Sequence, residues 1–84
     1  MSVYDPLRQR LLSAMGNAIC LSFSEIEGIT GRPLPESARS YDEWWSNEDP
    51  LKTTHTQSKA WTTVGFKAQV NRNRKMVTFK RFDR

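Results

Sequence analysis

The 84-residue sequence contains one cysteine and one histidine. A single cysteine, Cys20, excludes an internal disulfide, so we expect a reducing, cytoplasmic setting. One cysteine and one histidine cannot supply a typical zinc ligand set, so no metal is expected. The sequence has no apolar run of the ~18 residues that a transmembrane helix needs, and its start lacks the basic and apolar segments of a signal peptide. A membrane partner is therefore not expected.

Catalytic motifs are also lacking. The spacing suggests no Gly-rich phosphate loop and no Ser-His-Asp or Cys-His arrangement. The one histidine, His55, falls in a polar stretch. Asp42, Glu43 and Lys59 are residue types found in two-metal nucleases, but no motif connects them. The sequence therefore predicts a protein that is not an enzyme and needs no cofactor.

Positive charge is present in quantity but is unevenly spread. Residues 1–50 hold four basic and eight acidic residues, a net charge of −4, whereas residues 51–84 hold nine basic residues and one acidic residue, a net charge of +8. A basic segment of this density is typical of proteins that meet an anionic partner, most often nucleic acid. The alternative is a solvated surface. The chain length and the 37% hydrophobic content fit a single small domain over residues 1–84.

The first half of the sequence predicts a helix, a short strand and a second helix. Asp5 and Pro6 are typical of a helix start, and Gly16 and Asn17 of its end, with Leu12 and Met15 on the apolar face. The apolar run 19–21 predicts a short strand, in which Cys20 is expected to be a buried thiol. Ser22 and Glu25 form a capping box that opens the next helix, and Gly31 ends it.

The second half predicts a third helix and a basic hairpin. Pro35 suits a helix start, so a helix is expected over 35–41, joined to the preceding one by a short stiff turn. Residues 42–47 are expected to extend this helix or to form a strand. A loop is predicted over 47–55, and a short helix over 58–64 that ends at Gly65. Apolar and polar residues alternate over 66–71, a turn follows at 72–74, and the strand returns over 75–82 with Val77 and Phe79 inward. The fold class predicted is α+β, a winged helix-turn-helix-like domain in which helices precede a basic C-terminal β-hairpin.

Short segments over nearly the whole chain are distinctive in combination. They read YDPLR at 4–8, SFSEIE at 22–27, GRPLPESAR at 31–39, WWSN at 44–47, AW at 60–61 and GF at 65–66. With this set the chain resembles a family of small bacterial domains of unknown function, found alone or attached to longer proteins. The resemblance implies a bacterial or mobile-element origin and carries no established activity or site residues.

The basic hairpin and the helix 35–41 are the candidate nucleic-acid surface. A projecting basic turn can lie on phosphates or reach into the minor groove. Arg39 can donate twice to a guanine edge if its helix enters the major groove. Alternatively, this helix is a solvated connection. The candidate contact residues are Arg32, Ser37, Arg39, Ser40, Tyr41, Lys67, Arg72, Asn73, Arg74 and Lys75. We predict a small DNA-binding transcriptional regulator, expected to act as a homodimer because one module contacts few bases. Whether it prefers DNA or RNA stays open.

Two adjacent tryptophans support a second reading. Trp44 and Trp45 point in different directions on a strand, so one is expected in the core and the other to stack on a base or anchor a partner protein. Alternatively, both rings pack in the core. The second functional hypothesis is a protein-interaction module, an adaptor or a phage- or defence-related inhibitor, that uses the basic hairpin and an exposed tryptophan.

Overall fold

The computed structural model describes residues 3–47 and 56–82 and has a mixed α+β fold. A three-stranded antiparallel sheet has the strand order β1-β3-β2. In chain order the described elements are α1 (Asp5–Leu12), β1 (Ala18–Ser22), α2 (Phe23–Thr30), α3 (Glu36–Ser40), the 3-10 helix η1 (Asp42–Trp45), α4 (Thr56–Thr62), β2 (Phe66–Asn71) and β3 (Met76–Arg81). None of the described helices is long and apolar enough to span a membrane.

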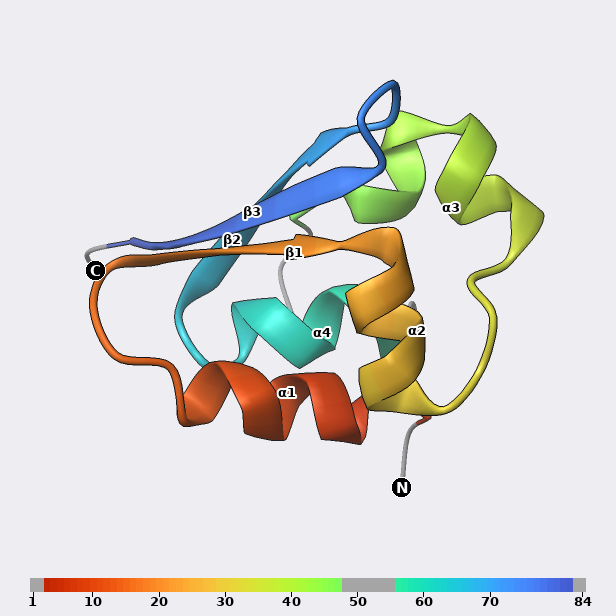
Figure 1. Cartoon of the computed structure of the whole chain (residues 1–84). Coiled ribbons are helices and arrows are strands. Elements are labelled where there is room, and N and C mark those ends of the chain that lie inside the picture. The colour runs from red at the N-terminus through yellow and green to blue at the C-terminus, as the bar shows by residue number, and fades with distance from the viewer. Residues whose placement is uncertain (1–2, 48–55, 83–84) are drawn as a thin grey trace.

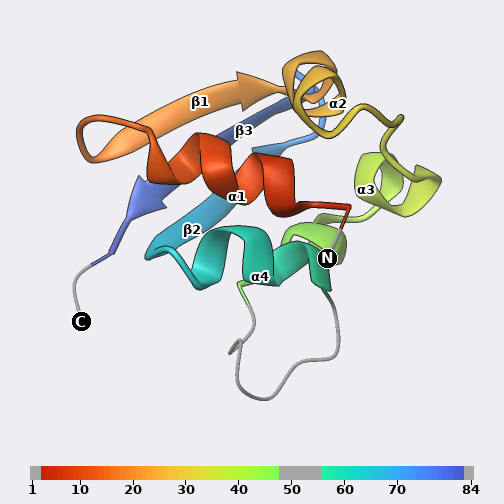
Figure 2. The same ribbon diagram turned by 90° about the horizontal axis from the view of Figure 1, so that it is seen from below.

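The helices cover one face of the sheet. Figures 1 and 2 show α1 and α4 under this face, α2 at the end where β1 finishes, and α3 beyond α2. The other face carries no helix among the described residues (Figure 1). The domain therefore has two layers, with its core between the sheet and the helices.

The strand register determines which residues enter that core. Phe79 of the central strand pairs with Ile19 on one side and Ala68 on the other, and Val77 pairs with Leu21 and Val70. Val77 and Phe79 are fully buried, which confirms the predicted inward positions. Residues between them point to the opposite face because side chains alternate along a strand.

Three predictions about the first half are wrong. Helix α1 ends at Leu12, not at Gly16. Leu12 and Met15, expected on its apolar face, are 52% and 91% exposed. The chain leaves the helix early because it must reverse through Gly16, whose φ is +90°, to enter β1. Cys20 is exposed, not buried. Since Leu21 faces the core, the strand alternation turns Cys20 outward.

The signals around α2 and α3 are confirmed. The Ser22 hydroxyl accepts from the Glu25 N–H, the Glu25 carboxylate accepts from the Ser22 N–H, and Gly31 ends α2 in the left-handed conformation. Pro35 precedes α3. The segment after it is neither an extension of α3 nor a strand, because Tyr41 is extended and η1 starts afresh. The predicted loop that contains Pro50 and His55 lies outside the described residues, apart from Asn47.

Candidate nucleic-acid interface

The turn between β2 and β3 gathers four of the predicted contact residues. Arg72, Asn73, Arg74 and Lys75 connect the last paired residues of the two strands and are all exposed. The Lys75 N–H donates to the Arg72 carbonyl at 3.2 Å, and the Asn71 side chain accepts from the Arg74 N–H at 3.2 Å. The turn is therefore internally bonded, and its four side chains are accessible to solvent. We call residues 72–75 the basic turn.

The basic turn is also attached to the core. The Phe23 N–H, at the start of α2, donates to the Lys75 carbonyl at 2.8 Å. This bond satisfies a helix N–H that has no partner inside the helix. Lys75 adopts a φ of +55°, a left-handed conformation that costs a lysine about 1 kcal/mol. The turn thus holds a charged residue where glycine or asparagine would be favoured.

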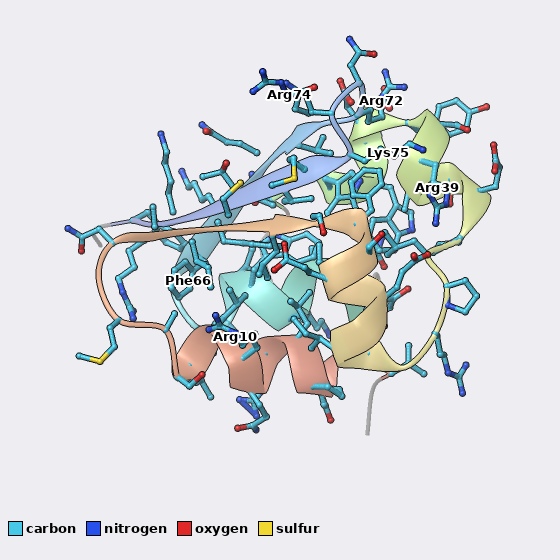
Figure 3. The ribbon with its side chains drawn as sticks, viewed as in Figure 1. Arg10, Arg39, Phe66, Arg72, Arg74 and Lys75 are labelled. Carbon is cyan, nitrogen blue, oxygen red and sulfur yellow. The ribbon has the colours of Figure 1, made fainter. Side chains whose placement is uncertain are left out.

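The basic turn lies beside α3 and η1. Figure 1 shows it at the same end of the molecule as these elements, and Figure 3 shows Arg39 at that end as well, with Arg10 on the opposite side of the sheet. Arg72 Nε and Asp42 Oδ1, 2.5 Å apart, form an ion pair that joins the turn to η1. Two regions that are about thirty residues apart in sequence are therefore neighbours.

Arg39, the predicted guanine reader, is engaged inside the domain. Its guanidinium lies 2.5 Å from the Glu27 carboxylate, which also accepts the Leu34 N–H at 2.6 Å. The Leu34 hydrogen bond, followed by the nearby Arg39 charge, lowers the pKa of Glu27, against the opposing effect of desolvation. In this position Arg39 holds α3 against α2, and it would have to leave Glu27 to contact a base.

The remaining candidates on this segment differ in exposure and in their partners. The Ser40 hydroxyl donates to Glu36 at 2.7 Å, Ser37 is half-buried, and Tyr41 is 61% exposed. Arg32 is exposed but follows the end of α2 that is remote from the basic turn. Eight helical residues, about 12 Å, separate the two ends. Arg32 is therefore not grouped with the basic turn.

The two tryptophans have different environments. Trp45 is 2% exposed, stacks between Phe23 and Trp61, and donates its Nε1–H to the Ala38 carbonyl at 2.8 Å. It belongs to the core and is closed to a base or a partner. Trp44 is half-buried and meets Tyr4 edge to face. Of the pair, only Trp44 keeps accessible surface.

A shallow groove of about 360 Å³ runs beside Trp44. Its lining residues are Ser37, Tyr41, Glu43, Trp44 and Gln57. Two aromatic rings and one carboxylate would suit a cationic side chain. Across residues 3–47 and 56–82, no three His, Cys, Asp or Glu side chains converge on a metal site.

Residues 4–82 match the model of a family described as a domain of unknown function (DUF7662). The chain belongs to this family. The match spans every described element from α1 to β3 and confirms the resemblance to a small-domain family of unknown function. No curated protein matches the chain, and no solved structure does.

Two residues of this DUF7662 domain have roles that the sequence reasoning missed. Glu27 joins α2 to the segment that leads into α3, and Asn47 joins the end of η1 to β2. Both lie within or at the end of the distinctive segments SFSEIE and WWSN. Each is a polar residue at the end of its segment, and this position was the available signal. The residues that the Glu27 and Asn47 side chains contact lie 7 to 21 positions away in the sequence.

Proposed function

We propose that this DUF7662 domain binds DNA through the basic turn, with α3 beside it. The observation that carries the proposal is that the basic turn and α3 lie at one end of the molecule (Figure 3). Arg74 and Lys75 are exposed and close together in the turn, so they can neutralise neighbouring phosphates. The inferred role is that of a small transcriptional regulator.

The element order supports a winged helix-turn-helix reading of the proposal. A helix, a strand, two helices and a hairpin follow one another, and the returning strand β3 pairs with β1. The helices η1 and α4 are additions to that plan. In this reading α2 and α3 form the helix-turn-helix and the basic turn is the wing.

The charges near the turn give its basic residues different roles. Arg72 is paired with Asp42, and Glu43 lies next to Asp42 in the same 3-10 helix. These carboxylates repel phosphates, so η1 contributes little to backbone affinity. We therefore assign the contacts with the phosphates to Arg74 and Lys75.

Fluorescence anisotropy with a labelled duplex, titrated between about 50 and 200 mM salt, tests the proposal. Arg74→Gln is expected to weaken binding and to reduce the slope of log K against log salt by about one. Arg10→Gln is the matched control, because Arg10 is exposed on α1, on the other side of the sheet. Absence of binding at low salt, or equal losses in both variants, would refute DNA binding through the turn.

The groove beside Trp44 favours a second candidate function, a protein-interaction module. Tyr41, 61% exposed, and Trp44 would anchor a basic side chain of a partner against Glu43. A pull-down from the host, compared with and without nuclease, distinguishes the two functions. Partners that survive nuclease but are lost with Tyr41→Ala support this candidate, and partners lost with nuclease support DNA binding.

A further inference from the structure

The face of the sheet that the helices leave open has a distinctive composition. The strand register places nine side chains on it, namely Ala18, Cys20, Ser22, Lys67, Gln69, Asn71, Met76, Thr78 and Lys80. The Thr78 hydroxyl lies 3.7 Å from the Cys20 sulfur across two strands, as expected for residues on one face. None of the nine is acidic and none is aromatic, so the face is polar and positively charged.

Two lysines lie directly opposite each other on this face. Lys67 of β2 is the register partner of Lys80 of β3, and both side chains are exposed. Like charges at directly opposite positions destabilise an antiparallel pair. Neither lysine forms an ion pair with another described residue, and the Lys67 ammonium instead lies 5.3 Å from the centre of the Phe82 ring. The pairing of two like charges costs the fold stability, whereas an anion lying across the strands would be held by both charges.

The lysine pair and the basic turn belong to one hairpin. From the Lys67–Lys80 pair to the last pair before the turn, Asn71–Met76, β2 advances four residues, about 13 Å. That length corresponds to about four base-pair steps of a duplex at 3.4 Å each. In Figure 1 the basic turn reaches the top of the molecule, on the side of the sheet away from α1 and α4. The two groups of charges can therefore meet phosphates along the same stretch of backbone.

We infer that the open sheet face extends the DNA site, with Lys67 and Lys80 holding the phosphodiester backbone of a duplex several base pairs from the basic turn. This rests on the proposed function and adds a second contact surface to it. A duplex is favoured over a single strand because single-strand sites combine positive charge with successive aromatic stacking platforms, and the nine positions hold none. The Phe82 ring beside them is half-buried and already lies against the Lys67 ammonium.

The variant Lys67→Glu separates binding from folding. It replaces a like-charge pair with an opposite-charge pair, a change that outweighs the loss of the surface contact between Lys67 and Phe82, so the melting temperature is expected to rise. Duplex affinity is expected to fall about tenfold near 0.1 M salt, with a shallower salt slope. A lysine with only a structural role would not move these two readouts in opposite directions. Lys67→Gln, which removes the repulsion without adding a negative charge, gives the same directions with smaller changes.

Lys59→Glu is the matched control, because Lys59 lies on α4, on the covered side of the sheet. Its effect on affinity is expected to stay within about twofold. If Arg74→Gln weakens binding but Lys67→Glu does so no more than Lys59→Glu, the sheet face is not part of the site and the proposed function stands. If the unmodified protein binds no duplex, both fail. A loss confined to a single-stranded oligonucleotide also overturns the assignment of a duplex.

Discussion

Asn47 hydrogen-bonds both backbone groups of Ala68. Its side-chain oxygen accepts the Ala68 N–H at 2.7 Å, and its side-chain nitrogen donates to the Ala68 carbonyl at 3.1 Å. Because β2 is an edge strand, these two groups would otherwise be unpaired. The same oxygen accepts the Nε1–H of Trp61, which is fully buried, at 3.0 Å. One side chain therefore closes the sheet edge and positions a core ring.

Asn47→Ala is expected to destabilise the domain by about 2 kcal/mol, because it leaves the buried Trp61 donor without its partner. Asn47→Asp keeps the acceptor but loses the donor to Ala68, and a loss of about 1 kcal/mol is expected. Urea denaturation measures both. Asn73→Ala in the exposed turn is the control and should change the free energy of unfolding by less than about 0.5 kcal/mol. Equal losses in the free energy of unfolding for Asn47→Ala and Asn73→Ala would show that the hydrogen bonds of Asn47 do not stabilise the domain.

Glu27 is expected to make stability depend on pH in the acid range. Its folded pKa is lowered, chiefly by the Leu34 N–H bond, from an ordinary value of 4.5. A lowered folded pKa stabilises the fold above the unfolded value, and this contribution is lost as the pH falls through the folded pKa.

The stability difference between the unmodified protein and Glu27→Gln should therefore be constant between about pH 6 and 8 and should shrink below about pH 4.5. Thermal denaturation at a series of pH values measures it. Glu43→Gln, at an exposed carboxylate on η1, controls for the loss of one negative charge. A difference for Glu27→Gln that does not change with acid would contradict the Leu34 and Arg39 contacts.

The adjacent tryptophans are expected to respond differently to the same substitution. Trp45→Phe removes the Nε1 hydrogen bond to Ala38 and leaves a gap between Phe23 and Trp61, at a cost of about 2 kcal/mol. Trp44→Phe acts on a half-buried ring and should cost about 0.5 kcal/mol. Chemical denaturation compares the two variants. A larger loss of stability for Trp44→Phe than for Trp45→Phe would contradict the placement of Trp45 in the core.

Local signals in the sequence were enough to predict several elements. The capping box predicted the start of α2 and Gly31 predicted its end, because each signal acts through residues three or four positions away. The alternation over 66–71 and 76–81 predicted the hairpin and its inward Val77 and Phe79, since a two-residue period leaves one buried face. The concentration of basic residues in the hairpin also follows from the sequence.

The tertiary structure decided what depends on contacts between remote residues. The early end of α1, the outward Cys20 and the choice of Trp45 for the core follow from how the helices pack on the sheet. The Glu27–Arg39 pair and the Asn47–Ala68 bonds have partners 12 and 21 positions away. The sequence by itself determined how much positive charge the hairpin carries. Only the fold decided that Lys67 faces Lys80 and that the basic turn lies beside α3, because strand register and layer packing bring those residues together.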